Sequence, residues 1–330
     1  MTSAAQDAAS WLANPRATRE TLEAFGLATK HRLGQNFLVE DNIIRKIIRL
    51  AELTLDDVVL EVGPGLGTLT VAMLDYVRAV CSIEADRELE GVLATTCKEP
   101  HQDSFVLCMG DALKATPRLV GDAYASLGVF ADVEGKEESG ALIGPNKFVS
   151  NLPYQVAATL ILLFFQEFTT LEQAVVMVQA EVADRIAAKP GTKAYGAYTA
   201  KLALYAQVSG RFEVAPGNFM PPPRVNSAVV RLERAPMTDP SGTGVLTSEQ
   251  LAWATRVIDA AFAQRRKTIR NSMGASGFKK DTLERALLAA HIEPTVRAEA
   301  LGVKDFVRLA MALAEGGAYG EETAFVHGRR

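Results

Sequence analysis

The chain has 330 residues, a length that predicts about two domains and a large hydrophobic core. Hydrophobic residues make up 48% and charged residues 22%, and the net charge of −4 means that any surface for nucleic acid must be a local basic patch. No apolar run approaches the roughly 18 residues of a membrane helix. The first 20 residues lack the apolar segment of a signal peptide, so we expect a cytoplasmic protein.

The cysteines and histidines argue against two kinds of site. Cys81, Cys97 and Cys108 are too few for a disulfide framework, and the first and last of them lie in apolar runs typical of buried thiols. The four histidines have no ligand spacing relative to one another or to cysteine. We therefore expect no metal site.

The first part of the chain predicts alternating helices and strands. Residues 1–29 predict a polar extension with a short helix, and Asp41-Asn42 is predicted to cap a helix over Ile43–Leu50, where apolar residues recur with helical spacing. Short apolar runs then predict the strands of a buried parallel sheet. They are Val58–Val62, Ala79–Ile83, Phe105–Cys108, Lys147–Ser150 and Ala174–Val178. This alternation predicts a doubly wound α/β domain over residues 30–240.

The alternation is interrupted once and then ends. Residues 120–146 contain several glycines and acidic side chains, which predict a solvated surface insertion. Pro221-Pro222-Pro223 cannot lie in a central strand, and Ser227–Leu232 predicts the last strand. After a linker at 236–246 we expect only helices, in a second domain over 241–316, followed by a tail over 317–330.

Glycines and carboxylates follow the first three predicted strands. Gly63, Gly65 and Gly67 form a G-x-G-x-G pattern, whose backbone can approach a ligand closely and which suits a nucleoside with an amino-acid tail better than a pyrophosphate. Glu84 ends the second strand, where a carboxylate can bind ribose hydroxyls. Asp111 follows the third strand and can accept a hydrogen bond from an adenine amine. The alternative is that both carboxylates cap the helices that follow them.

The turn Asn151-Leu152-Pro153-Tyr154 follows the fourth predicted strand. It can present an amide oxygen, a backbone carbonyl and a ring face to one flat ligand that carries an exocyclic amine. Asn and Pro are also ordinary turn residues, so a strand-terminating turn without a ligand is the alternative.

Basic residues concentrate late in the chain. Arg265-Arg266-Lys267 is followed by Arg270, Lys279 and Lys280, with no acidic residue between 262 and 280. A solvated helix face is the alternative interpretation of such a run. We favour phosphate contact, because a nucleic-acid surface on a chain with net negative charge has to be a local concentration of positive charge.

Five segments in this order give the chain its resemblance to a known family. They are Gly34–Leu38, Glu61–Gly67, Asn151–Tyr154, Phe219–Ser227 and Arg265–Asn271. Together they resemble the small-subunit ribosomal RNA adenine dimethyltransferases, from about Lys30 to Ala312.

The resemblance implies a Rossmann-like class I methyltransferase domain, dependent on S-adenosylmethionine, with a smaller all-helical C-terminal domain that binds RNA. It implies dimethylation of N6 of two adjacent adenines in the 3′-terminal hairpin loop of 16S ribosomal RNA, within the small subunit or its precursor and coupled to ribosome biogenesis. We expect a monomeric enzyme.

The resemblance also implies roles for individual residues. The residues expected to bind the cofactor are Asn36, Leu38, Gly63, Gly65, Glu84, Asp111 and Asn151. At the target base, the amide oxygen of Asn151 and the carbonyl of Leu152 would accept the two N6 hydrogens. Pro153 follows these two residues in the chain and precedes Tyr154. The ring of Tyr154 would stack on one face of the base, and Phe219 would cover the other. The residues expected to contact RNA are Arg224, Arg265, Arg266, Lys267 and Arg270.

Three other functions are alternatives to this one. The nearest alternative enzymes are the related large-subunit adenine methylases that confer macrolide resistance. The alternative that is not primarily an enzyme is a ribosome-assembly factor that acts mainly by binding. A nicotinamide-dependent oxidoreductase is disfavoured by the glycine spacing and by the Asn151–Tyr154 turn.

Overall fold

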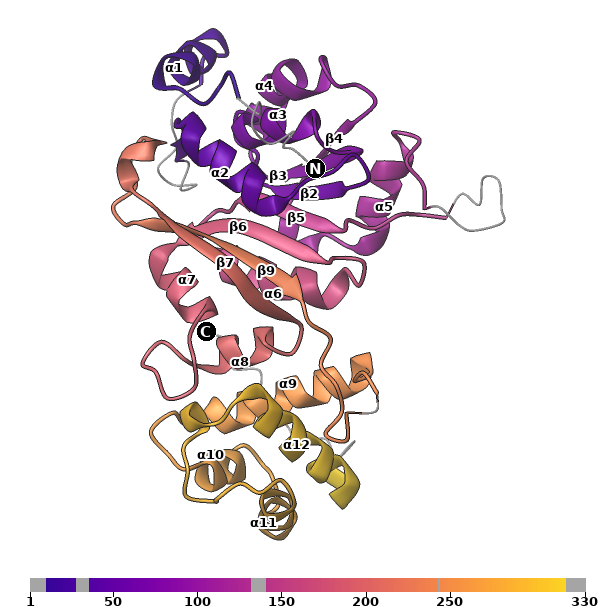
Figure 1. The fold of residues 1–330 in the computed structure, drawn as a ribbon, viewed down its shortest axis with the longest axis vertical. Coiled ribbons are helices and arrows are strands. Elements are labelled where there is room, and N and C mark those ends of the chain that lie inside the picture. The colour runs from indigo at the N-terminus through magenta and orange to yellow at the C-terminus, as the bar shows by residue number, and fades with distance from the viewer. Residues whose placement is uncertain (1–9, 28–35, 132–140, 243, 319–330) are drawn as a thin grey trace. The chain divides into compact units, whose positions relative to one another are not determined.

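The computed structural model describes residues 10–27, 36–131, 141–242 and 244–318. The chain divides into two compact units, which are described separately (Figure 1). The first comprises Met1–Ala183 and Val208–Arg234, and the second comprises Asp184–Gln207 and Ala235–Arg330. The chain therefore crosses between the units three times.

A seven-stranded sheet organises the first unit, in the order β4-β3-β2-β5-β6-β9-β7 (Figure 1). The strands are β2 (Val58–Val62), β3 (Ala79–Glu84), β4 (Phe105–Met109), β5 (Lys147–Asn151), β6 (Gln173–Gln179), β7 (Ala206–Val214) and β9 (Ser227–Arg234). Neighbouring strands from β4 to β6 are parallel, and β9 is antiparallel to β6. The predicted doubly wound fold is confirmed, and its strand order reverses direction between β2 and β5.

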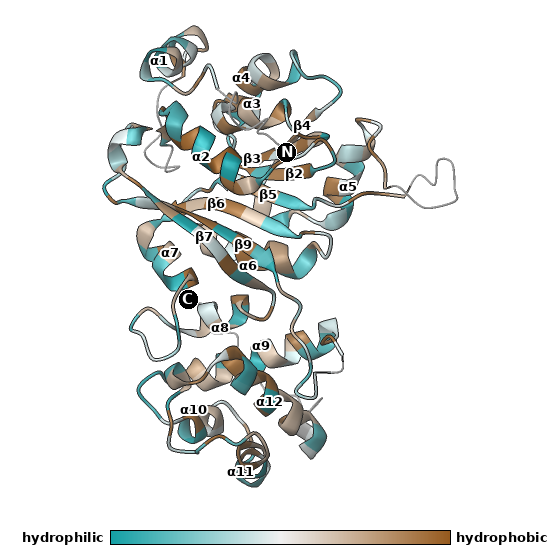
Figure 2. Cartoon of the chain, viewed as in Figure 1, coloured by the Kyte–Doolittle hydropathy of each residue, from teal (hydrophilic) through white to brown (hydrophobic). Residues whose placement is uncertain are grey.

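Helices cover both faces of this sheet. The helices of the first unit are α1 (Pro15–Ala24), α2 (Asp41–Ala51), α3 (Thr68–Leu74), α4 (Glu90–Leu93), α5 (Pro117–Ala125), α6 (Ala157–Glu167) and α7 (Ala180–Ile186), of which only the part up to Ala183 belongs to this unit. Side chains alternate between the faces of a strand. Val149 of β5 therefore packs in one core with Ile44 of α2, whereas Phe148 points the other way, with its ring 4.9 Å from that of Phe164 in α6. Figure 2 shows the hydrophobic stretches of the strands between these helices.

Three details of the first unit differ from the sequence prediction. Helix α2 begins after Glu40, whose carboxylate accepts from the Asn42 amide, so the cap lies before the predicted Asp41-Asn42. Residues 120–125, predicted to begin a surface insertion, belong to α5 and bury Tyr124 completely; residues 132–140 lie outside the described part. Strand β7 was not predicted, because its residues are mostly exposed and carry no apolar run. A further pair, β1 (Phe37–Leu38) and β8 (Phe219–Met220), is antiparallel.

The second unit is helical, as predicted. Its helices are α8 (Ala197–Leu202), α9 (Ser248–Phe262), α10 (Ile269–Ala275), α11 (Lys280–Ala289) and α12 (Val303–Leu313). The indole of Trp253 in α9 donates to the Ala310 carbonyl of α12 at 2.8 Å, and the rings of Phe262 and Phe306 lie 5.7 Å apart. None of the helices that the structure describes in either unit is long and apolar enough to cross a membrane.

Residues 184–207 cluster with the second unit, although the sequence analysis placed them in the first domain. The reason lies in polar contacts that the sequence does not reveal. The Tyr195 hydroxyl donates to the Leu301 carbonyl at 2.8 Å, and Lys201 pairs with Asp259 at 2.8 Å. The segment thus belongs to the helical unit by its packing while lying between β6 and β7 in the chain.

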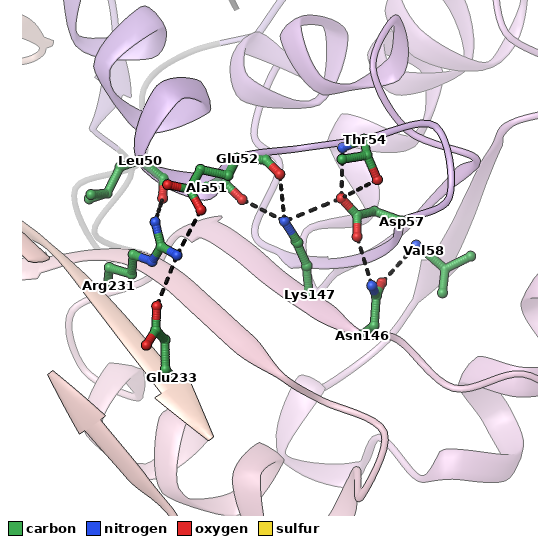
Figure 3. Close-up of polar contacts among 10 residues, drawn as sticks. All are labelled: Leu50, Ala51, Glu52, Thr54, Asp57, Val58, Asn146, Lys147, Arg231 and Glu233. Carbon is green, nitrogen blue, oxygen red and sulfur yellow. Dashed lines mark hydrogen bonds and ion pairs between the residues drawn. The ribbon is translucent and has the colours of Figure 1, made fainter. Parts of the chain in front are cut away.

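A buried cation joins the amino ends of β2 and β5 (Figure 3). The ammonium of Lys147, the first residue of β5, donates to the carbonyls of Ala51 at 2.7 Å and Glu52 at 2.8 Å, at the end of α2. It also lies 3.2 Å from the carboxylate of Asp57, which precedes β2. Positive charge at a helix C-terminus is favourable, and the carboxylate offsets the cost of burying it.

The Asn146 side chain completes this junction. Its amide group donates to Asp57 at 2.7 Å, and its oxygen accepts from the Val58 backbone at 2.9 Å. Arg231 of β9 reaches the same helix end, donating to the Leu50 carbonyl at 3.0 Å (Figure 3). The end of α2 is therefore bound directly to β5 and β9, and through Lys147 and Asp57 to the start of β2.

We expect Lys147→Met to destabilise the first unit by about 3–5 kcal/mol, because it leaves the buried Asp57 carboxylate without its cation and two helix carbonyls without a donor. Urea unfolding measures the change. Arg118→Met is the control, since the Arg118–Asp122 pair is exposed and 3.7 Å long, and we expect it to cost at most about 1 kcal/mol. Equal losses in the two variants would contradict the prediction.

Candidate active site

A cavity of about 430 Å³ opens at the carboxyl ends of β2, β3, β4 and β5. Its position beside the β2–β5 reversal is where open α/β sheets bind ligands. All the residues expected to bind the cofactor line it, as does the whole turn from Asn151 to Tyr154. The structure therefore brings together two sets of residues that are up to 118 positions apart in the chain, from Asn36 to Tyr154.

The glycine turn after β2 has to be free of side chains. Gly63 and Gly65 have φ values of +68° and +63°, a region that favours glycine. A Cβ on Gly63 would lie 3.2 Å from the ring of Pro153, and one on Gly65 would lie 3.2 Å from that of Phe37. These glycines thus allow the loop after β2, the turn after β5 and the β1 segment to close around the same cavity.

Every charged side chain in the cavity wall is acidic. The wall contains Glu61, Glu84, Asp86 and Asp111, and among the described residues that line it there is no Lys, Arg or His. A wall of this kind favours a cationic ligand and disfavours a pyrophosphate. The observation supports the interpretation of the glycine spacing as unsuited to a dinucleotide.

Glu84 and Asp111 both line the cavity, and of the two only Asp111 caps the helix that follows it; the helix after β3 is capped by Asp86 instead. Glu84 accepts from the Asp86 amide at 2.8 Å, and Asp111 accepts from the Leu113 amide at 3.0 Å. Burial raises the pKa of Glu84, and backbone amides, including that of Gly65, partly offset this. For Asp111, capping and a position in the cavity wall are therefore compatible, whereas Glu84 is held in the wall by backbone amides and caps no helix.

Glu61 is a cavity residue to which the sequence analysis gave no role. It precedes the glycines on β2, is fully buried, and accepts hydrogen bonds from the hydroxyls of Thr70 at 2.7 Å and Ser82 at 2.6 Å. Burial raises its pKa to about 7, despite these two donors. The signal in the sequence was a carboxylate inside an otherwise apolar strand, which requires buried partners.

The Asn151–Tyr154 turn is held by its backbone and by its last side chain. The Leu152 amide donates to the Met177 carbonyl of β6 at 3.1 Å, and the Pro153 carbonyl accepts from the Val156 and Ala157 amides at the start of α6. The Tyr154 hydroxyl lies 2.6 Å from the Ser227 hydroxyl, and burial raises the pKa of Tyr154 above its ordinary value. The side chain therefore stays a neutral phenol near pH 7.

Phe219 does not line the cavity, which differs from the expected clamp. Its side chain is buried in the same core as α2, and its backbone pairs with Leu38 in the β1–β8 ladder. Its ladder partner Leu38 lines the cavity, and Phe219 does not. The covering of a second base face by Phe219 stays a prediction that this arrangement does not support.

The expected RNA-binding residues are exposed, but two of them are already paired. Arg265 pairs with Glu299 at 3.0 Å and donates to the Lys193 carbonyl at 2.9 Å, so it also holds the second unit together. Arg270 lies 3.8 Å from Glu284. Residues 262–280 contain no acidic side chain, but two of their arginines pair with carboxylates from later in the chain. The exposed residues of the set are Arg224 in the first unit and Arg265, Arg266, Lys267 and Arg270 in the second.

Within the described ranges, no group of three or more His, Cys, Asp or Glu side chains is arranged to hold a metal ion. Asn36 and Leu38 line the cavity, whereas Gly34 and Gln35 of the same motif lie outside the described residues.

Comparison with known proteins identifies the family. The family model described as ribosomal RNA adenine dimethylase matches residues 26–315. The chain belongs to the ribosomal RNA adenine dimethylase family. It is therefore a ribosomal RNA adenine dimethyltransferase that uses S-adenosylmethionine, as the sequence resemblance implied.

Relatives of this family resemble the chain over nearly its whole length. Ribosomal RNA small subunit methyltransferase A of Kineococcus radiotolerans is 38% identical over 92% of this chain and 93% of its own. The protein with the same name from Acidothermus cellulolyticus is 39% identical over 89% of this chain and 92% of its own.

Solved structures share the fold. A dimethyladenosine transferase from Plasmodium falciparum superposes with a TM-score of 0.64 at 22% identity, covering 85% of this chain and 98% of its own. The 23S rRNA methyltransferase ErmE superposes with a TM-score of 0.59 at 24% identity, covering 84% of this chain and all of its own. Both confirm the predicted class I methyltransferase fold.

The cavity fits this cofactor by its charge. S-adenosylmethionine carries a positive sulfonium and a positive ammonium group, and the wall described above offers four carboxyl groups and no cationic side chain among the described residues. Burial raises the pKa of Glu61 in this wall to about 7.

We expect the stability of the first unit to fall as pH rises, in a way that depends on Glu61. Its pKa is about 7 when folded, against an ordinary value of 4.5, so the folded state binds the extra proton. The stabilisation is complete below about pH 4.5 and is lost as pH rises through about 7. Urea unfolding at pH 5.5 and at pH 8 measures this loss. Between the two pH values, the free energy of unfolding of the wild type should fall by on the order of 1–2 kcal/mol more than that of Glu61→Gln, whose side chain cannot titrate. Parallel pH profiles for the two proteins would contradict this assignment.

Proposed function

We propose that this enzyme dimethylates N6 of two adjacent adenines in the 3′-terminal hairpin loop of 16S ribosomal RNA, in the small subunit or its precursor. The observation that carries the reaction is the cavity, whose acidic wall and Asn151–Tyr154 turn meet at the β2–β5 reversal. The 38–39% identity with proteins named ribosomal RNA small subunit methyltransferase A supports the choice of RNA. Action on ribosomal subunits would make the enzyme cytoplasmic and part of ribosome biogenesis, and we propose that it works as a monomer.

In this proposal each side of the cavity holds one part of the cofactor. Glu84 binds the ribose hydroxyls, Asp111 accepts from the adenine amine, and the loop of Gly63 and Gly65 faces the methionine part. Asn36 and Leu38 close over the cofactor from the β1 side. Their common position in the cavity wall supports these roles.

Asn151 and Leu152 act on the target base. The lone pair of an adenine N6 is delocalised into the ring, which makes the nitrogen a poor nucleophile. Two acceptors, the Asn151 amide oxygen and the Leu152 carbonyl, draw the N6 hydrogens aside and localise the lone pair on the side that faces the cofactor. S-adenosylmethionine supplies an electrophilic methyl group, so the protein has to align the groups and needs little acid–base chemistry.

Tyr154 binds the extruded base in this proposal. Taking an adenine out of its stack costs a few kcal/mol, and stacking on an aromatic ring returns about 1–3 kcal/mol. The exposed Arg224, Arg266 and Lys267 are proposed to contact RNA phosphates, since neither Arg266 nor Lys267 has a carboxylate partner among the described residues. Arg265 and Arg270 can add to this surface while keeping their own ion pairs.

The experiment that tests the proposed substrate is methyl transfer from labelled S-adenosylmethionine to purified small and large ribosomal subunits. Nucleoside analysis should give N6,N6-dimethyladenosine, and primer extension should map it to two adjacent adenines near the 3′ end of 16S RNA. Modification confined to large-subunit RNA would support the macrolide-resistance type of activity instead. Binding to subunits without methyl transfer would support an assembly factor.

We expect Asn151→Ala to lower kcat for methyl transfer by about 100-fold or more, because the variant loses an acceptor that positions the target amine. RNA affinity, measured by filter binding, should change little. Asn42→Ala is the control, since Asn42 is an exposed asparagine of α2 that does not line the cavity, and it should keep full activity. Full activity of Asn151→Ala would refute the role assigned to this residue.

A further inference from the structure

Ser227 is buried behind the Asn151–Tyr154 turn, and its hydroxyl contacts that of Tyr154 at 2.6 Å. Ser227 has no exposed surface and is the first residue of β9, where it pairs with Gln179 at the end of β6. The contact therefore reaches from the turn after β5 to a strand that is two positions away in the sheet.

Both ends of this contact are fixed to the sheet. The Leu152 amide donates to the Met177 carbonyl of β6 at 3.1 Å, and the carbonyl of Asn226, beside Ser227, accepts from the Ala180 amide at 2.9 Å. A tyrosine ring turns about two side-chain bonds, so one hydrogen bond at its tip restricts the tilt of the whole ring. The ring of Tyr154 is thus held at its backbone and at its hydroxyl.

The contact also gives the Tyr154 hydroxyl its hydrogen-bond partner. A phenol hydroxyl in a partly closed cavity needs such a partner. Ser227 supplies it without lining the cavity, so the hydroxyl does not have to compete with a substrate amine for the Asn151 amide oxygen or the Leu152 carbonyl.

We propose that Ser227 is a positioning residue, whose hydroxyl holds the ring of Tyr154 in the plane on which the target adenine stacks. This inference rests on the proposed function, because it takes Tyr154 as the stacking ring. Ser227 acts through Tyr154 and does not line the cavity itself. It therefore affects how the base is held, and leaves the binding of the cofactor unchanged.

The test is a double-mutant cycle on the full-length enzyme with small ribosomal subunits as substrate. Ser227→Ala and Tyr154→Phe each remove the same hydrogen bond from one side, and the second variant keeps the ring. A net hydrogen bond of this kind corresponds to roughly a fivefold change. We expect each variant to lower kcat about fivefold with an unchanged KM for S-adenosylmethionine, and the double variant to be no slower than either one.

A matched control separates positioning from simple loss of stability. Thr18→Val removes another fully buried hydroxyl of the first unit. Thr18 lies in α1, does not line the cavity, and donates to the Leu12 carbonyl at 3.1 Å. It should lower the melting temperature without lowering kcat. Fluorescence of 2-aminopurine in place of the target adenine gives a second measurement, and Ser227→Ala should weaken the quenching caused by stacking.

Three results would overturn the inference: full kcat in Tyr154→Phe, losses that multiply in the double variant, or a Ser227→Ala variant that is destabilised but transfers methyl groups at the wild-type rate. Tyr154→Phe alone keeps the test decisive if Ser227→Ala does not fold. The wild-type enzyme in the same assay tests the proposed substrate separately. If it modifies only large-subunit RNA, the substrate proposal fails, and the same cycle on that RNA still tests Ser227.

Discussion

The buried ammonium of Lys147 sets the arrangement on which the rest of the first unit depends. It binds the last carbonyls of α2 and the carboxylate of Asp57, and so brings the amino ends of β2 and β5 together. In the ladder between these strands two residue pairs lie opposite each other, Val59 with Lys147 and Leu60 with Phe148. Beyond these pairs the Ser150 hydroxyl donates to the Val62 carbonyl at 2.6 Å, and the cavity opens at the carboxyl ends of the two strands, where Gly63 and Asn151 line it. A charge at one end of the strand pair thus supports a binding site at the other.

Much of this architecture could be predicted from the sequence because it depends on local signals. Apolar β-branched runs such as Val58–Val62 mark buried parallel strands, and parallel strands place their carboxyl ends on one edge, which brings Glu84, Asp111 and Asn151 together. The resemblance to a family added the identity of the ligand. The edge strand β7 was missed for the opposite reason, since a half-exposed strand has no apolar run to reveal it.

Other features depend on contacts between distant segments and leave no local pattern. The sequence around Arg265 suggests a free basic run, but Glu299, 34 positions later, neutralises part of it. The segment 184–207 has no composition that assigns it to the helical unit, and only partners such as Leu301 do so. Ser227 looks like an ordinary strand residue until its bond to Tyr154, 73 positions away, is seen.

The acidic wall of the cavity has a consequence for turnover. Methyl transfer removes the positive charge from the sulfonium of the cofactor, and the spent molecule keeps its ammonium and its carboxylate and therefore has no net charge. Glu61, Glu84, Asp86 and Asp111 attract the unreacted form more strongly than the product, because electrostatic attraction in a partly buried site grows with ligand charge. An enzyme that must methylate the same nitrogen twice needs to exchange its cofactor between the two transfers. The wall that recruits the methyl donor is thereby also the feature that lets the spent donor leave.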